Sequence, residues 1–133
     1  MLSVLKAEDC MTRMLVTAGP DMDAHEAINL LLKHEISGMP VVDETGKLVG
    51  ILSEKDCIEP LLDAEYHELP PALVRDLMST ELTTVTPDTD VLKVADLFVN
   101  SGLRRLPVLD KDHLVGQISR RDVLRAIEKM GEE

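Results

Sequence analysis

Apolar and polar residues follow two periods along this chain, one typical of helices and one typical of short strands. At 24–31 and at 91–98, apolar residues recur at positions i, i+3, i+4 and i+7, which places them on one face of a helix. Shorter runs are rich in Val, Leu and Ile, and their length and composition indicate strands. These strands are predicted at 39–42, 48–52, 106–109 and 114–118. The chain is therefore expected to mix helices and strands.

The connections between the strands favour hairpins. The first connection, 43–47, contains Gly46, which can adopt the positive φ that such turns require. The second, 110–113, is one residue shorter and has no glycine. A weaker strand is predicted before each first helix, at 15–17 and at 82–85.

A last helix is predicted from Ser119 to Gly131. Its expected apolar stripe consists of Val123, Leu124, Ile127 and Met130. The corresponding helix after Ser53 meets Pro60, which should break or kink it because proline lacks a backbone N–H.

The order of elements occurs twice because the sequence repeats itself. A shift of 67 places aligns Asp9 with Asp76, Met11 with Met78, Pro20-Asp21 with Pro87-Asp88, and Pro40-Val41 with Pro107-Val108. After the shorter second turn the shift becomes 66, and Ser53 and Asp56 then align with Ser119 and Asp122. We assign residues 1–62 to a first repeat, 63–72 to a connection and 73–133 to a second repeat.

The predicted fold class is α/β (α+β), with two β-α-β-β-α repeats packed about a pseudo-two-fold axis. One such repeat exposes an apolar sheet face that it cannot cover alone, and a second copy covers it. This arrangement would leave two equivalent clefts between the copies.

Composition excludes several classes of function. The net charge is −11 and aromatic residues make up 2% of the chain, so neither phosphate neutralisation nor base stacking supports nucleic-acid binding. No apolar stretch approaches the ~20 residues of a membrane span, and the N-terminus does not resemble a secretory signal. Cys10 and Cys57 do not form a disulfide scaffold. A cytoplasmic protein is expected.

Catalytic machinery is not evident. The four histidines are scattered without metal-ligand spacing. No glycine-rich phosphate loop, nucleophile elbow or paired catalytic carboxylate stands out. We therefore expect no catalytic residues, no metal and no catalytic cofactor.

The repeated segments resemble the cystathionine-β-synthase (CBS) domain. The resemblance is carried in the second repeat by 74–79, 106–110 and 116–122, and in the first by 9–12, 38–43 and 50–56. It spans nearly the whole chain, twice and in order. The pair is therefore similar to a stand-alone CBS module, also called a Bateman module.

The resemblance implies a non-catalytic regulatory module with two clefts for adenosine-containing ligands such as AMP, ADP, ATP, S-adenosylmethionine or NAD-type molecules. In this family the Gly-x-x-Ser-x-x-Asp segment places its aspartate on the ribose hydroxyls and its serine near phosphate. The residues so implied are Asp56 with Ser53, and Asp122 with Ser119. The adenine slot would be lined by Met39, Pro40, Leu106, Pro107, Thr17 and Thr84.

Two interpretations of the Ser-x-x-Asp motif stay open. A carboxylate can accept hydrogen bonds from two vicinal hydroxyls, and a helix that begins at the serine directs free N–H groups toward a phosphate. The same spacing is also that of an ordinary capping box. One geometry can serve both roles.

Basic residues flank the second motif in an otherwise acidic chain. They are Arg104, Arg105, Arg120 and Arg121, whereas Lys55 is the basic residue at the corresponding positions of the first repeat. They either contact a phosphate or form ion pairs on a solvated face. If they contact phosphate, Asp122→Ala should weaken binding of a phosphorylated ligand more than Asp56→Ala does.

Two other functions compete with the regulatory hypothesis. A structural or interaction protein would have vestigial clefts, plugged by Met39, Leu106 or ion pairs of the arginines. An enzyme acting on a nucleotide is the third hypothesis.

Partners are predicted from the helices. Leu30–Leu32 and Leu97–Val99 are each three consecutive apolar residues, so these helices are apolar on more than one face. The resemblance implies a homodimer paired through these helices. In the alternative, the termini and the connection at 60–71 cover the same faces within one chain. A regulated partner enzyme or transporter is also implied by the resemblance.

Overall fold

The structure is a computed structural model that describes residues 5–62 and 71–131. The chain divides into two compact units. Unit 1 combines Met1–Leu15 with Thr83–Glu133, and unit 2 is Val16–Leu82. Unit 1 therefore joins the start of the chain to most of the second repeat, and unit 2 joins most of the first repeat to the start of the second, up to Leu82. Most of the predicted connection 63–72 lies outside the described residues.

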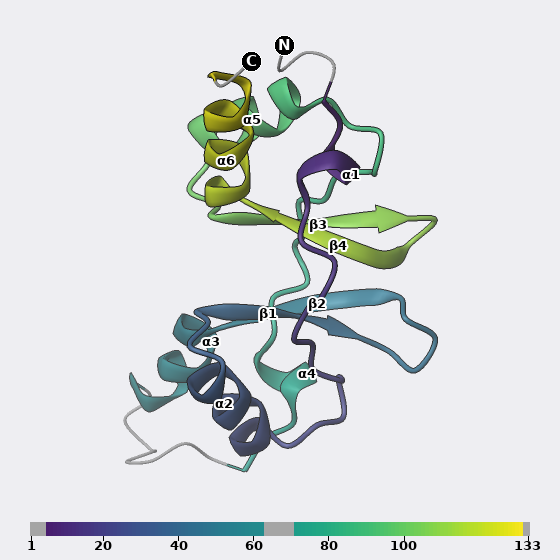
Figure 1. The fold of residues 1–133 in the computed structure, drawn as a ribbon. Coiled ribbons are helices and arrows are strands. Elements are labelled where there is room, and N and C mark those ends of the chain that lie inside the picture. The colour runs from purple at the N-terminus through teal and green to yellow at the C-terminus, as the bar shows by residue number, and fades with distance from the viewer. Residues whose placement is uncertain (1–4, 63–70, 132–133) are drawn as a thin grey trace. The chain divides into compact units, whose positions relative to one another are not determined.

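Unit 2 consists of a two-stranded antiparallel hairpin with helices on one face (Figure 1). Its elements are α2 (Ala24–Lys33), β1 (Gly38–Val42), β2 (Leu48–Ser53), α3 (Glu54–Ile58), the 3-10 helix η2 (Glu59–Leu62) and α4 (Val74–Leu77). Gly46 has a φ of 88°, as the predicted turn requires. The α-helix after Ser53 ends before Pro60, which confirms the predicted break.

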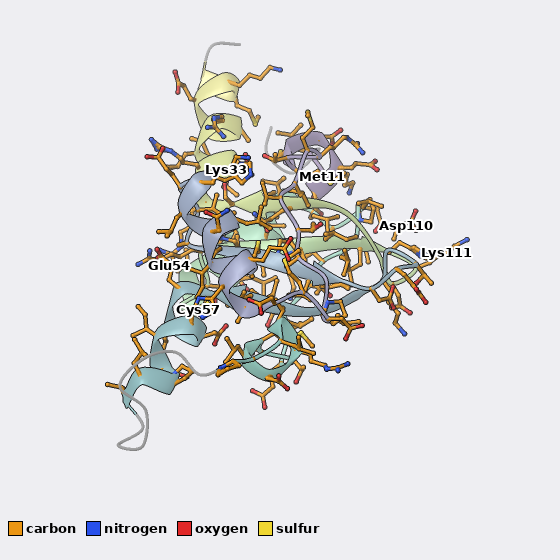
Figure 2. The ribbon with its side chains drawn as sticks, turned by 90° about the horizontal axis from the view of Figure 1, so that it is seen from below. Met11, Lys33, Glu54, Cys57, Asp110 and Lys111 are labelled. Carbon is orange, nitrogen blue, oxygen red and sulfur yellow. The ribbon has the colours of Figure 1, made fainter. Side chains whose placement is uncertain are left out.

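Unit 1 has the same arrangement, with α5 and α6 covering one face of its hairpin (Figure 1). Its elements are α1 (Ala7–Cys10), α5 (Val91–Asn100), β3 (Arg105–Asp110), β4 (His113–Ser119) and α6 (Arg120–Gly131). Asp110 and Lys111 are labelled at the tip of the hairpin in Figure 2. Without a glycine, this turn places Lys111 and Asp112 at positive φ, 50° and 70°.

The strands predicted at 15–17 and 82–85 are wrong as strands, because no residue of 15–17 pairs with a hairpin and only Val85 of 82–85 does. Ala18 pairs in parallel with Val41, and Val85 with Val108. In a parallel ladder the next carbonyl toward the N-terminus would need an N–H from Pro40 or Pro107, which proline lacks. In the other direction, Pro20 and Pro87 have no N–H to donate.

Two short helices, α1 and α4, were not evident in the hydrophobic pattern. Each begins with a backbone N–H that donates to an aspartate three residues on: Lys6 N to Asp9 Oδ2 (2.8 Å) and Leu73 N to Asp76 Oδ2 (2.9 Å). The chain leaving α1 then places Met11 against Gly116, and the chain leaving α4 places Met78 against Gly50. Met11 is labelled in Figure 2.

Each unit has its own aliphatic core. The unit 1 core is built on Val94, Phe98, Leu106, Val108 and Ile118, and the unit 2 core on Ala27, Leu31, Met39, Val41 and Leu52. The predicted stripe of α6 is only partly correct. Val123 is buried together with Asp122 and Ala126, whereas Leu124 and Ile127 are 62% and 48% exposed.

Candidate functional site

Both Gly-x-x-Ser-x-x-Asp segments lie where the second hairpin strand ends and a helix begins. In unit 2, Ser53 Oγ accepts from Asp56 N (3.1 Å) and Asp56 Oδ2 accepts from Ser53 N (2.9 Å). In unit 1, Ser119 Oγ accepts from Asp122 N (3.2 Å) and Asp122 Oδ2 accepts from Ser119 N (2.8 Å). The capping box is therefore present in both repeats, and it holds each carboxylate in one orientation.

The Asp122 carboxylate has further partners. Its Oδ1 accepts from Arg125 Nη1 (3.0 Å) and lies 3.4 Å from Thr12 Oγ1, while Oδ2 also accepts from Ser119 Oγ (3.0 Å). The side chain is 7% exposed. A buried carboxylate is stabilised when cationic and hydroxyl donors engage both of its oxygens.

The Asp56 carboxylate is set in a different environment. It is half-buried, and within the described part of the chain its side chain is bonded to Ser53 alone, through Oδ2. The repeat position of Arg125 is occupied by Glu59, whose carboxylate pairs with Lys55 Nζ at 3.6 Å. Glu54 and Cys57 lie on the same short helix (Figure 2). Among the described residues, Oδ1 of Asp56 therefore has no cationic partner, unlike Oδ1 of Asp122.

The residues predicted to line an adenine slot fall into two groups. The Met39 and Leu106 side chains are 1% and 0% exposed and belong to the two cores, so these positions can offer a ligand only backbone atoms. Pro40 and Pro107 are also buried, and their carbonyl oxygens accept from Ala18 N (3.0 Å) and Val85 N (3.0 Å).

The two predicted threonines directly precede these paired positions. Thr17 and Thr84 are half-buried and stand one residue before Ala18 and Val85. The parallel pairing therefore keeps each threonine beside its own hairpin.

The basic residues of the second repeat are not equivalent. Arg120 donates through Nε to the carbonyl oxygen of Leu103 (3.0 Å) and through Nη2 to that of Phe98 (3.5 Å), which satisfies carbonyls at the end of α5. Arg104 and Arg121 are exposed and Arg105 is half-buried. The helix-end role of Arg120 is therefore structural.

Thr12 and Arg125 at Asp122 were missed by sequence reasoning. Arg125 stands three residues after Asp122, a spacing that brings side chains together on a helix and could have indicated the contact. Thr12 is separated from Asp122 by 110 residues along the chain. In the sequence, the only sign that this segment matters was the repeat, which aligns Met11-Thr12 with Met78-Ser79.

Cys10 lies beside the same carboxylate. Burial raises the pKa of the Cys10 thiol, and the neighbouring Asp9 and Asp122 carboxylates raise it further. Burial also raises the pKa of the Cys57 thiol. Both thiols are therefore kept protonated and weakly nucleophilic near neutral pH.

A surface cavity of about 470 Å³ lies in unit 2, away from the Ser-x-x-Asp motif. It is lined by 19–22 and 42–45, at the end of β1 remote from Ser53. Its carboxylates include Asp21, which is paired with Arg75 at 2.7 Å, and Asp43. These acidic walls do not suit a phosphate.

Neither a metal-ligating cluster nor a membrane span is found in the part of the chain that the structure describes. No group of three or more His, Cys, Asp or Glu residues in 5–62 and 71–131 could hold a metal ion. Over the same ranges no helix has the length and apolar character needed to cross a membrane.

The family model for the CBS domain matches this chain twice, at residues 7–63 and 74–129. Among curated relatives, the inosine-5'-monophosphate dehydrogenase of Methanocaldococcus jannaschii is 32% identical over 124 residues. That match covers 92% of this chain but 24% of the dehydrogenase, so the chain spans about a quarter of that enzyme's length.

Solved structures of similar length have the same fold. The Arabidopsis thaliana CBS-pair protein CBSX2, in its complex with AMP, is 29% identical with a TM-score of 0.81, and the match covers 95% of this chain and 98% of that chain. The CBS domain pair of protein MJ0100, in complex with 5'-methylthioadenosine and S-adenosyl-L-methionine, is 28% identical with a TM-score of 0.77, covering 95% and 98%.

Proposed function

The chain belongs to the CBS domain family, and from that premise we propose that it is a non-catalytic regulatory module that binds an adenosine-containing ligand. The observation that carries the proposal is the doubled Gly-x-x-Ser-x-x-Asp motif, in which Asp56 and Asp122 are each oriented by a capping box. AMP, ADP, ATP, S-adenosylmethionine and NAD-type molecules share the adenosine group that this site would recognise. Complexes of similar CBS pairs with AMP and with S-adenosyl-L-methionine support this choice.

The chemistry of the site follows from the capping box. The serine backbone N–H holds Oδ2 of each aspartate, and at Asp122 the Ser119 hydroxyl donates to Oδ2 as well. The other oxygen, Oδ1, is then the one that would accept from the vicinal hydroxyls of a ribose. Backbone carbonyls and amides of β1 or β3, and of the segment around Thr17 or Thr84, would form the hydrogen bonds to the adenine. Binding transmits a signal only if the ligand has different affinities for two conformations of the module. A partner enzyme or transporter that binds one of those conformations would then be regulated.

Isothermal titration calorimetry with AMP, ATP, S-adenosylmethionine, 5'-methylthioadenosine and NADH tests the proposal. We expect at least one of these ligands to bind the parent protein. Replacing both motif carboxylates, Asp56→Ala with Asp122→Ala, should weaken that binding about ten- to a hundred-fold, because a charge-assisted hydrogen bond contributes roughly 1.5–3 kcal/mol.

Asp76→Ala is the matched control for this experiment. Asp76 also accepts a capping bond at the start of a short helix, from Leu73 N at 2.9 Å, but it lies outside the Ser-x-x-Asp motif. Its loss should lower stability without lowering affinity. If none of the five ligands binds the parent protein, the proposed function is wrong.

A structural or interaction protein is the second candidate, and the Arg125–Asp122 ion pair favours it. In this alternative an intramolecular contact permanently occupies the motif. Absence of binding by the parent protein together with a stable fold would support it. A nucleotide-converting enzyme would instead consume ATP, which incubation of the purified protein followed by product analysis would detect.

Self-association is part of the proposal. On α2 and α5, the consecutive apolar residues do not all face the core. Leu31 and Phe98 are buried, whereas Leu32 and Val99 are 69% and 81% exposed. Further apolar side chains are exposed on α6, among them Leu124 and Ile127. A homodimer paired through the helix faces of α5 and α6 would bury this unit 1 surface.

A further inference from the structure

The two motif carboxylates differ in how much of their hydrogen-bonding capacity is already used. Asp122 Oδ1 accepts from Arg125 at 3.0 Å and has Thr12 Oγ1 at 3.4 Å, in a side chain that is 7% exposed. Asp56 Oδ1 has neither contact among the described residues, and the position matching Arg125 is Glu59. The repeats are therefore alike in fold but unlike at the carboxylate oxygen that would receive a ribose.

We infer that Arg125 is a specificity-determining residue that closes the Asp122 site, so that an adenosine ligand binds through Asp56 and reaches Asp122 only by displacing the Arg125 guanidinium. This inference rests on the proposed function. It reverses the ranking that the arginines of the second repeat suggested on sequence grounds.

Competition for one oxygen is the physical basis. A guanidinium–carboxylate bond is charge-assisted, whereas ribose hydroxyls are neutral donors, so exchanging one for the other weakens the interactions of a buried carboxylate. The Thr12 hydroxyl, 3.4 Å from Oδ1, is a second donor at this oxygen, and the Thr12 backbone is paired with that of Gln117 (2.8 and 2.9 Å). A ligand at Asp122 must therefore replace two existing donors.

The first repeat has the opposite charge at the competing position. Glu59 cannot donate to Asp56, and its carboxylate is drawn to Lys55, with Nζ and Oε1 3.6 Å apart. Within 5–62 and 71–131, Oδ1 of Asp56 is therefore left for donors from outside the motif. On this inference, Arg125 in place of Glu59 closes the second motif, and Thr12 adds a second contact at 3.4 Å.

The closure is reversible because Arg125 is a surface side chain. Its side chain is 69% exposed, so it can turn into solvent without leaving a cavity in the core. An alternative is that Arg125 leaves Asp122 to contact a ligand phosphate. The two ideas predict opposite effects of removing the guanidinium, since closure opposes binding and phosphate contact promotes it.

Calorimetric titration of the full chain with AMP and, separately, with 5'-methylthioadenosine tests the inference. We expect one strong binding event per chain in the parent, weakened about ten- to a hundred-fold by Asp56→Ala and weakened less by Asp122→Asn. Arg125→Ala should add a second binding event, which Asp122→Asn then removes in the double variant. Arg121→Ala, which deletes an exposed arginine of the same helix, is the matched control and should add none.

Each contrary outcome identifies what failed. Two equal events in the parent, loss of the parent event in Asp122→Asn but not in Asp56→Ala, no added event in Arg125→Ala, or weaker binding by that variant would each overturn the closure while leaving the proposed function standing. If neither probe binds the parent or any variant, and the wider ligand set also fails, the proposed function itself is wrong. Circular dichroism of every variant verifies folding, and exposed Arg125 provides a substitution that leaves both cores intact.

Discussion

Asp43 illustrates how a single carboxylate organises the turn between β1 and β2. Its Oδ1 accepts from Thr45 Oγ1 (2.6 Å), Thr45 N (2.9 Å) and Lys47 N (3.1 Å). The Thr45 hydroxyl, with the backbone amides of Lys47 and Thr45, holds the pKa of Asp43 below its ordinary value. Hydrogen bonds that favour the ionised form stabilise the folded hairpin only while Asp43 is charged.

We predict a pH-dependent stability difference between the parent and Asp43→Ala. Because the folded-state pKa lies below the unfolded value, the contribution of Asp43 is fully present above the unfolded pKa and is lost as pH falls through the folded pKa. Urea unfolding at neutral pH should show the variant to be less stable, and the difference should shrink in acid. Glu44→Ala, a neighbouring exposed carboxylate in the same turn, should show a smaller difference; an equal one would contradict the prediction.

At the scale of elements, the segment that follows α1 packs closely on β4 at Gly116, and the segment that follows α4 packs closely on β2 at Gly50. A Cβ at Gly116 would lie 2.5 Å from Met11 Sδ and 3.1 Å from the carbonyl oxygen of Thr12. At Gly50 the corresponding distances are 2.5 Å to Met78 Sδ and 3.0 Å to the carbonyl oxygen of Ser79. The same approach in both repeats shows why the strand needs a glycine beside each methionine.

Gly116→Ala should therefore destabilise unit 1 by about 1–3 kcal/mol, the usual effect of overpacking. The measurement is the free energy of unfolding from denaturant titration. Gly102→Ala is the control, since a Cβ there meets no heavy atom within 4 Å. Shortening the methionine in the double variant Gly116→Ala/Met11→Ala should recover part of the loss attributable to Sδ. Equal stability of the two single alanine variants would show that the methionine and backbone adjust freely.

At the scale of the whole molecule, the exposed apolar helix faces lead to a prediction about mass. Light scattering at micromolar concentration should give the mass of a dimer. Leu124→Glu combined with Ile127→Glu should shift it to a monomer, because a carboxylate placed in an apolar interface loses its hydration without gaining a partner.

Met14→Glu is the control for the dimer, since Met14 is 93% exposed and lies between α1 and α2 rather than on α5 or α6. It should leave the mass unchanged. A parent protein that is monomeric at micromolar concentration would overturn the stable homodimer. Dissociation by Met14→Glu alone would show that the interface lies elsewhere.

The sequence by itself determined the elements that depend on local spacing. The 3.6-residue period predicted α2 and α5, the apolar runs predicted both hairpins, and Pro60 predicted the end of α3. The doubled Ser-x-x-Asp spacing predicted both capping boxes, because their donors and acceptors lie within three residues. The repeat and the family resemblance followed from the order of these same signals.

Tertiary structure decided what depends on residues far apart in the chain. No local pattern indicates that Thr12 meets Asp122 across 110 residues, or that 5–15 packs with the second repeat. The strands predicted at 15–17 and 82–85 do not form, because a parallel ladder would need a backbone N–H that Pro40 and Pro107 on the hairpins lack. Likewise, Met39 and Leu106 fit either a slot or a core by sequence, and their side chains lie in the cores because alternation along a paired strand turns them toward the helices. The two motifs share the Gly-x-x-Ser-x-x-Asp spacing, and the Arg125 and Thr12 contacts that distinguish Asp122 from Asp56 are made only in the folded chain.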